Sequence, residues 1–200
     1  IPELRSTSGL GTGIKLPFFL ALGNSRDLTL TPYISTSQTS TLELRYRQAL
    51  SFGTLEANAA VSRDDLLPGQ TRAYLFTDAS FSLPHDFQLG AQLRLTSDRA
   101  YLLDYSITPE DRLWSGLTLQ RLRADQLIWL RAGNTRSLRD REVNDTEPML
   151  AADLDWVQVW RPATIGGEVV VQAGLHGHQR GSQLAFDGPD ADLDADGRDV

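Results

Sequence analysis

The sequence predicts an all-β protein, an antiparallel meander of about ten strands. The first observation behind this prediction is that apolar and polar residues alternate with a period of two along most of the 200 residues. The second is that no stretch repeats its apolar residues at the spacing of a helix. The third is strand length: the alternating runs are about nine to twelve residues long, close to the length with which a β-strand crosses a bilayer.

The first two expected strands cover residues 14–22 and 28–35 and are joined through residues 23–25. Each has a proline in its middle, Pro17 in the first strand and Pro32 in the second. Because proline donates no N–H to a sheet, it belongs at edges, strand starts or bulges. The two prolines therefore predict a weakly bonded sheet edge, and we expect function to be located there.

The residues before these strands, 1–13, are rich in Ser, Thr and Gly, and we expect them to form a linker or an extended entry segment. The chain begins at Ile1 rather than at a methionine, and it stops at Val200 within a polar stretch. Both ends are expected to be cuts through a longer protein.

Eight further strands are expected, almost free of internal proline. They are predicted over residues 42–47, 54–62, 72–83, 87–96, 113–120, 126–136, 150–156 and 168–178. In each strand one face is apolar and the other is polar. The strand over 42–47 is the clearest case, since Leu42 and Leu44 alternate with Glu43 and Arg45. This pattern predicts a sheet with one apolar and one polar face.

Two architectures produce such a sheet, a soluble β-sandwich with the apolar face in its core and a membrane barrel with the apolar face toward lipid. Charged residues such as Glu43, Arg94 and Asp153 lie deep inside the strands, as a wet lumen permits. Short turns at 50–53 and 83–86 alternate with long connections, which is typical of an outer-membrane meander. The long connections cover residues 63–71, 97–111 and 139–147. The pattern favours a barrel segment, and the β-sandwich remains the alternative.

Composition excludes several classes of function. The net charge of -7 and the pI of about 4.9 argue against nucleic-acid binding. Without cysteine there is no disulfide framework, thiolate nucleophile or cysteine-based zinc site. The sequence contains no nucleophile elbow, phosphate loop or His-Glu-x-x-His motif, and no acid–base pair stands out. We therefore expect neither an enzyme nor a cofactor.

One acidic motif is a weak candidate for a metal site. Asp192, Asp194 and Asp196, followed by Gly197, fit the first half of a calcium loop. The bidentate acid expected six residues after that glycine would fall beyond the end of the sequence. We interpret this stretch as a solvated acidic extracellular loop.

The histidines and tryptophans are the remaining candidates. His176 and His178 share one face of a strand and would need a third ligand, which the sequence does not offer, so we interpret them as a polar pair that faces the lumen. His85 is expected to be exposed in a turn. The tryptophans fit an interfacial girdle or, equally, the core of a sandwich. They are Trp114, Trp129, Trp156 and Trp160.

The proline-containing opening resembles a known family. Leu16-Pro17-Phe18-Phe19 followed by Leu28-Thr29-Leu30-Thr31-Pro32-Tyr33 is similar to the start of the barrel of the LPS-assembly protein LptD, also called organic solvent tolerance protein OstA, including the proline spacing. Residues 98–105 are similar to a recurrent Tyr-Leu-x-Asp-aromatic segment of that barrel. The tail over 187–200 resembles a loop of the alphaproteobacterial branch. The resemblance covers most of the chain from about Gly11 onward, and its two-proline opening is the most specific part.

The resemblance implies that residues 14–200 are a partial LptD-type barrel domain, incomplete at its C-terminal end and part of a large transmembrane barrel in the outer membrane of a Gram-negative bacterium. LptD proteins insert lipopolysaccharide into the outer leaflet. Their barrel is plugged by a lipoprotein, LptE, and they receive lipid from an LptA-type periplasmic bridge through a jelly-roll, which is not in this sequence. Only Pro17 and Pro32 match residues of the lateral gate. A passive porin-like barrel segment and a soluble glycan-binding β-sandwich are the alternatives.

Overall fold

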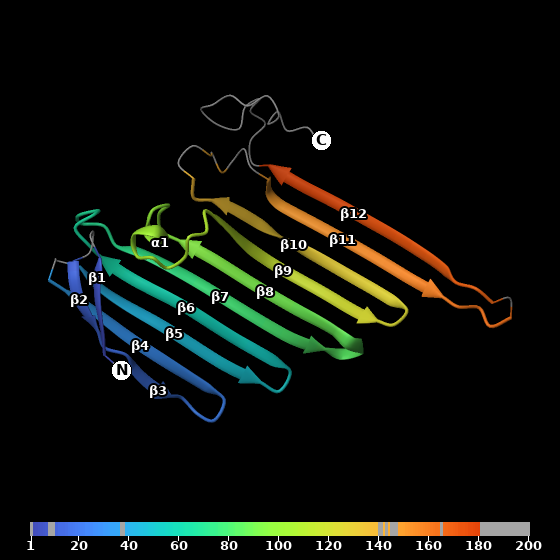
Figure 1. Cartoon of the computed structure of the whole chain (residues 1–200), viewed down its shortest axis with the longest axis horizontal. Coiled ribbons are helices and arrows are strands. Elements are labelled where there is room, and N and C mark those ends of the chain that lie inside the picture. Colours follow the sequence, from blue (N-terminus) through green and yellow to red (C-terminus); the bar gives the residue numbers. More distant parts are fainter. Residues whose placement is uncertain are drawn as a thin grey trace. The chain divides into compact units, whose positions relative to one another are not determined.

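The computed structural model describes residues 2–7, 11–36, 39–139, 142, 144, 148–164 and 166–180. Within them the chain forms twelve strands, a one-turn helix α1 (Tyr101–Asp104) and a 3₁₀ turn η1 (Pro84–Asp86) (Figure 1). The strands are β1 (Glu3–Thr7), β2 (Gly11–Lys15), β3 (Phe18–Ala21), β4 (Arg26–Ser35), β5 (Ser40–Leu50), β6 (Gly53–Arg63), β7 (Arg72–Leu83), β8 (Phe87–Thr96), β9 (Arg112–Arg123), β10 (Gln126–Ser137), β11 (Pro148–Trp160) and β12 (Val169–Arg180).

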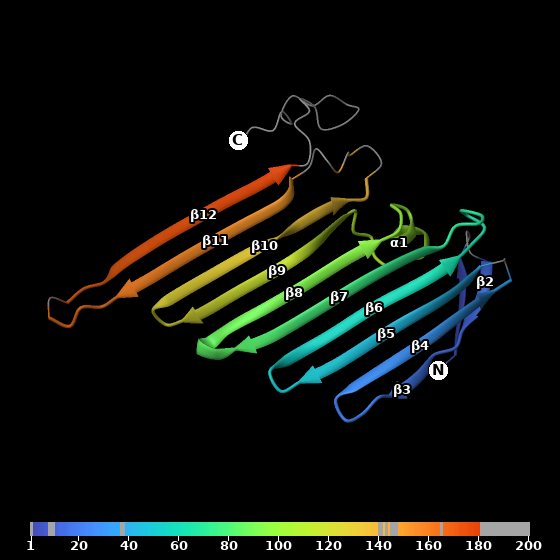
Figure 2. The same ribbon diagram turned by 180° about the vertical axis from the view of Figure 1, so that it is seen from behind.

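The strands belong to one antiparallel meander with the order β1-β2-β4-β5-β6-β7-β8-β9-β10-β11-β12, and β3 pairs with β4 beside that path (Figure 2). The prediction of an all-β meander is confirmed. Over the described residues the order ends at β1 on one side and at β12 on the other, so the sheet is open there and is not closed into a barrel. None of the described helices is long and apolar enough to cross a membrane.

The count of twelve exceeds the expected number because of the first part of the chain. Residues 1–13, expected to be a linker or an extended entry segment, contain β1 and most of β2. The strand expected over 14–22 is divided at Pro17 into β2 and β3. The ladder with β4 is interrupted there because Pro32, which is opposite Leu16, has no N–H to donate.

The chain divides into two compact units. The first contains residues 1–79 and 93–111, and the second contains residues 80–92 and 112–200. In the first unit the strand register places most apolar side chains of β2 to β6 on one face and most charged ones on the other. Leu42, for example, is opposite Val61, whereas Arg45 is opposite Asn58.

The buried residues of the first unit lie on its polar face and in its loops, whereas its apolar face is open. On β6 the apolar side chain of Val61 is 47% exposed, and its neighbour Ser62, which points to the other face, is 1% exposed. Above Ser62 lie Tyr101 and Tyr105, both buried, from the connection that contains α1. Figure 1 shows α1 at the end of the sheet where β7 begins.

Candidate functional site

The proline-containing edge keeps one continuous register with β4. Lys15 of β2 is opposite Tyr33, and Phe18 of β3 is opposite Leu30. The two pairings are in phase, so the residues between β2 and β3 do not shift the strand. The break between β2 and β3 therefore does not change which side chains face which side.

Pro32 removes a hydrogen bond between β4 and the first strand. The Leu16 N–H donates to the Pro32 carbonyl at 3.1 Å. In an antiparallel sheet the two residues of such a pair exchange two bonds. The return bond, from residue 32 to the Leu16 carbonyl, is impossible because Pro32 has no N–H. The pair is thus held by one bond where another residue would allow two.

Pro17 removes a donor from the opposite side of the same strand. Leu16 and Leu22 both donate their N–H groups toward β4, to Pro32 and Arg26. Successive residues of a strand alternate in direction, so the nitrogen of Pro17 points away from β4, toward the outer edge. Among the described residues β3 pairs only with β4. The missing donor of Pro17 therefore belongs to an edge that is open beside β3.

The side chains of this edge are uncovered as well. Phe18 is 56% exposed and Phe19 is 61% exposed, on opposite faces of β3. An edge with few bonds and exposed aromatic side chains is suited to meet another apolar surface or another strand. The geometry agrees with the expectation of a weakly bonded edge, and the role of Pro17 and Pro32 in a gate remains a prediction.

A second feature, at the end of the sheet where β7 begins, is a buried ion-pair cluster around Arg72. The guanidinium binds the carboxylates of Asp64 at 3.2 Å, Asp98 at 2.8 Å and Asp104 at 2.8 Å. Arg72 as a whole is 1% exposed. Asp64 belongs to the connection after β6, and the other two acids belong to the connection after β8. We call these four residues the Arg72 cluster; it fixes both long connections to the start of β7.

The acids of the Arg72 cluster are bound by further donors. Asp64 accepts a 2.7 Å hydrogen bond from the hydroxyl of Tyr105 and two 3.1 Å bonds from the backbone N–H groups of Leu66 and Leu67. Burial raises the pKa of the Asp64 carboxyl, but these bonds and Arg72 lower it by more, so the net pKa lies below its usual value. The carboxylate form is therefore favoured at neutral pH.

Asp98 has the same balance. It accepts hydrogen bonds from the Tyr101 N–H at 2.9 Å and from the Ser97 hydroxyl at 2.8 Å, in addition to Arg72. Burial opposes the charge of Asp98, and the Arg72 and Ser97 bonds outweigh it, so its pKa is also lowered. The bond to Tyr101 places Asp98 directly before α1, and it thereby fixes the position of the one-turn helix.

The tyrosines of this connection extend the hydrogen bonding onto the polar face of the sheet. Thr41 and Ser62 share a 2.8 Å hydrogen bond, and Ser62 shares a 2.6 Å bond with the Tyr101 hydroxyl. The Arg72 guanidinium carbon lies 5.1 Å from the centre of the Tyr101 ring and 5.9 Å from that of Tyr105. Burial is the main cause that raises the pKa of Tyr105 to about 12 and that of Tyr101 above its usual range, so both hydroxyls stay neutral.

The Arg72 cluster is a structural ion-pair network that holds two connections against the start of β7. Its carboxylates are bound by the guanidinium and by hydroxyl and backbone donors, which leaves no poised nucleophile or general base. Sequence reasoning had selected residues 98–105 for their resemblance but missed the partner, Arg72. Three aspartates spread over two connections, next to a strand that begins with arginine, were the available signal.

The polar face of the first unit carries a ladder of ion pairs. They join Lys15 to Glu43, Arg47 to Asp27, Arg45 to Glu56 and Arg94 to Asp78. Three of these pairs join neighbouring strands, and the Lys15–Glu43 pair reaches across β4. Such opposite charges stabilise a sheet modestly. Charges deep inside the strands, the feature that favoured a barrel, thus occur in pairs on one face.

The predicted histidine and metal candidates are placed as follows. His176 binds the carboxylate of Asp153 at 2.9 Å across β11 and β12. Strand alternation puts His178 on the same face, and no group of three or more potential ligands for a metal ion occurs in the described part of the chain. His85 is exposed in η1, as expected. Asp192, Asp194 and Asp196 lie outside the described residues.

The four tryptophans are divided between the two faces of the second unit. Trp114 and Trp129 share the face of Asp155, whereas Trp156 and Trp160 point to the other face. The guanidinium carbon of Arg131 lies 3.9 Å from the centre of the Trp114 ring. Trp160 is 45% exposed. These tryptophans therefore form no single core, since they occupy opposite sides of one sheet.

Comparisons with known proteins add no relative to these observations. No protein-family model matches the chain, and no curated protein matches it significantly.

Proposed function

We propose that this chain is part of an outer-membrane translocon of the LptD type, which inserts lipopolysaccharide into the outer leaflet, and that the edge at Pro17 and Pro32 lies beside its lateral gate. The proposal joins the resemblance of the two-proline opening to the geometry of the edge. It places the chain in the outer membrane of a Gram-negative bacterium, with the chain a fragment of a large transmembrane β-barrel.

The observation that carries the proposal is the inverted distribution of burial. A soluble sheet covers its apolar face, but here Ile34, Leu42 and Val61 are 63%, 42% and 47% exposed on one face. The opposite face carries the ion-pair ladder and the buried hydroxyls of Thr41 and Ser62. Both faces of such a sheet are favourably solvated when lipid covers the apolar face and water covers the polar face. This supports a barrel segment over a soluble glycan-binding β-sandwich.

The edge supports a gate rather than a passive porin-like barrel. A seam between two strands opens when few hydrogen bonds cross it, and each bond contributes roughly 0.5–1.5 kcal/mol net in water and more in lipid. Pro17 takes a donor from the outer edge, and Pro32 weakens the pairing of that strand with β4. Both changes make the segment from Pro17 through β3 easier to move. A passive channel has no use for a loosened strand.

The partners follow from the same proposal. We expect lipopolysaccharide as cargo, an LptE-type lipoprotein as the plug of the completed barrel, and an LptA-type bridge that delivers lipid through a jelly-roll. No catalytic role and no nucleic-acid partner are proposed. The polar face, with its paired charges, would line the lumen.

The decisive experiment restores both backbone donors in the full-length parent protein. Pro17→Ala with Pro32→Ala is expected to impair lipopolysaccharide display at the cell surface and to raise sensitivity to large hydrophobic drugs. Pro68→Ala, in the connection between β6 and β7, is the matched control, because it also replaces a proline but leaves the edge untouched. Unchanged display in the double variant at normal protein level would contradict the gate and favour the passive channel.

Membrane association is tested separately. The full-length parent, extracted with a phase-separating detergent, is expected in the detergent-rich phase. Recovery in the aqueous phase would contradict every membrane hypothesis and return the soluble β-sandwich to first place.

A further inference from the structure

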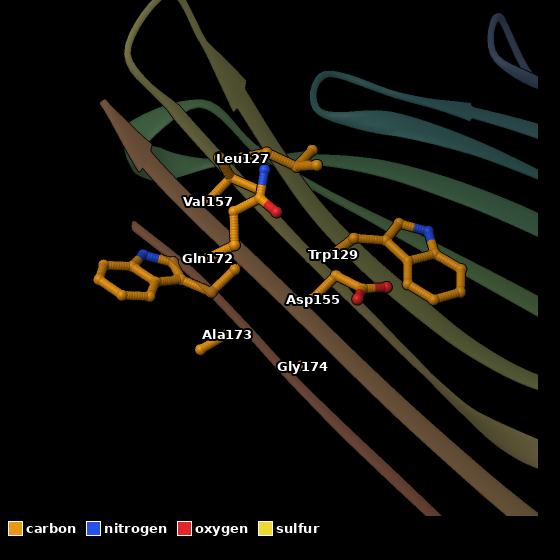
Figure 3. Close-up of a pocket in the computed structure, with 8 residues that line it drawn as sticks. Leu127, Trp129, Asp155, Val157, Gln172, Ala173 and Gly174 are labelled. Carbon is orange, nitrogen blue, oxygen red and sulfur yellow. The ribbon is translucent and has the colours of Figure 1, made fainter. Parts of the chain in front are cut away.

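The polar face of β10, β11 and β12 holds a pocket of about 650 Å³ that the proposed gate does not use (Figure 3). This volume lies within the range of small-molecule sites, about 300–1,000 Å³. Its principal lining residues are Leu127, Trp129, Asp155, Val157, Gln172 and Gly174. Trp129 is directly opposite Asp155, which is opposite Gly174 on the next strand. The pocket lies wholly within the second unit.

Three polar side chains line this pocket, and in the described part of the chain none of them has a hydrogen-bond partner. They are the indole N–H of Trp129, the carboxylate of Asp155 and the amide of Gln172. Neighbouring polar groups differ, since Asp153 binds His176 at 2.9 Å and Gln126 binds Gln158 at 2.7 Å. The pocket thus offers one donor, one acceptor and one group that does both, next to the flat face of an aromatic ring.

Gly174 keeps the space beside the carboxylate open. A Cβ atom at this position would lie 3.4 Å from Oδ1 of Asp155 and 3.7 Å from the ring of His176. Any side chain there would occupy the volume in front of the acid. Its φ angle is not in the left-handed region, so the backbone does not demand glycine. The absence of a side chain therefore opens the pocket.

We propose that this pocket binds a pyranose ring of a saccharide, which stacks on the indole of Trp129 and hydrogen-bonds to Asp155 and Gln172. The C–H groups on one side of a pyranose are slightly positive and suit the negative face of an indole. A hydroxyl both donates and accepts, so it can use all three free groups. An ammonium ion would also sit between indole and carboxylate, but it only donates and would leave the Trp129 N–H unused. The inference does not depend on the proposed gate.

The test measures binding to the whole chain in detergent by isothermal titration calorimetry, with maltopentaose and cellopentaose as uncharged probes. At least one of them is expected to bind, and Trp129→Ala to weaken it at least about tenfold, or 1.4 kcal/mol. Gly174→Val should block binding by filling the space beside Asp155. Trp129→Phe, which keeps a flat ring, should retain part of the affinity and guards against misfolding of the alanine variant.

Two controls lie on the other face of the same strands. Trp160→Ala removes an exposed indole, and Gly177→Val adds a side chain where no atom lies within 4 Å of the new Cβ. Both should bind the saccharide as the parent does. Failure of both probes to bind at millimolar concentration would overturn the proposal, as would Trp129-dependent binding of tetramethylammonium alone. The proline variants leave this pocket untouched, so the two proposals fail independently.

Discussion

Two regions of the first unit, the Arg72 cluster and the edge of β2 and β3, are bonded in opposite ways. In the cluster Arg72, which is 1% exposed, binds three carboxylates, and neighbouring hydroxyls and N–H groups bind those of Asp64 and Asp98 in turn. At the edge two prolines remove backbone donors, and Phe18 and Phe19 are more than half exposed. The same sheet thus fixes its long connections firmly and leaves β3 paired on one side only among the described residues.

This contrast indicates which parts of the first unit can move at low energetic cost. A buried charge without partners is very costly, so the connections over 64–71 and 97–111 cannot leave Arg72 without a large penalty. An edge strand that has already lost donors gives up little when it moves. The structure therefore combines a rigid end of the sheet with a loosened side, and the following predictions test that contrast in order of expected effect.

Removal of the guanidinium should have the largest effect. Arg72→Ala leaves Asp64 and Asp98 without their cation and is expected to cost about 3–5 kcal/mol of the stability of the docked connections. Hydrogen exchange of residues 97–111 should accelerate and limited proteolysis should cut there. Arg63→Ala, which removes an exposed arginine at the end of β6, is the control and should leave the exchange unchanged. Equal protection in both variants would show that the cluster does not hold the connection.

Acid should weaken the same docking in a defined range. The folded pKa values of Asp64 and Asp98 are lowered, so their stabilisation is fully present above the unfolded value of about 3.9 and is lost as the pH falls through the folded values. Exchange protection at α1, corrected for the intrinsic pH dependence of exchange, should hold from pH 7 to about 5 and decline below about 4. A decline that begins near pH 6 would implicate histidine instead of these acids. The residues of β3, which are Phe, Phe, Leu and Ala and bind no carboxylate themselves, should not respond.

The expected strands agree with the structure where the fold depends on local alternation. The runs over 42–47 and 54–62 lie inside β5 and β6, because a period of two marks a half-covered strand whatever its neighbours are. β1 was missed because Leu4 is its one large apolar residue among polar ones. The interruption at Pro17 was not expected as a strand boundary, since the alternation continues on both sides of it.

Less of the candidate sites could be predicted, because they depend on strand pairing and on contacts between residues far apart in the sequence. Pro17 and Pro32 could be selected because the effect of proline on a ladder is a property of the residue itself. Which edge each proline weakens depends on the direction of its nitrogen, and that direction follows from pairing. Arg72 and Asp98 are 26 positions apart, and their contact arises from the way two connections fold back. No short-range pattern records such a contact.

Tyr105 and Tyr101, which pack against the Arg72 cluster, should contribute unequally to stability. Tyr105→Phe removes a 2.7 Å hydrogen bond to a charged carboxylate, a type of bond worth about 1.5–3 kcal/mol. Tyr101→Phe removes a bond to the neutral hydroxyl of Ser62, worth about 0.5–1.5 kcal/mol, and Ser62 keeps its bond to Thr41. Denaturant unfolding of the two variants should show the larger loss for Tyr105→Phe. The reverse order would mean that Ser62, rather than Asp64, anchors the connection.

The two prolines should give the smallest effects and should differ from each other. Either replacement by alanine costs about 0.4–1 kcal/mol, because the unfolded chain gains freedom. Pro32→Ala also restores a donor opposite the Leu16 carbonyl, worth about 0.5–1.5 kcal/mol, so its net effect should be close to zero. In the 200-residue chain, Pro17→Ala adds an N–H that faces the open edge and should be the less stable variant. Amide exchange decides the comparison: the new N–H at position 32 should be protected and that at position 17 should exchange freely. Protection at position 17 would mean that another strand already covers this edge, and the contrast with the Arg72 cluster would then be smaller than the register of β2, β3 and β4 implies.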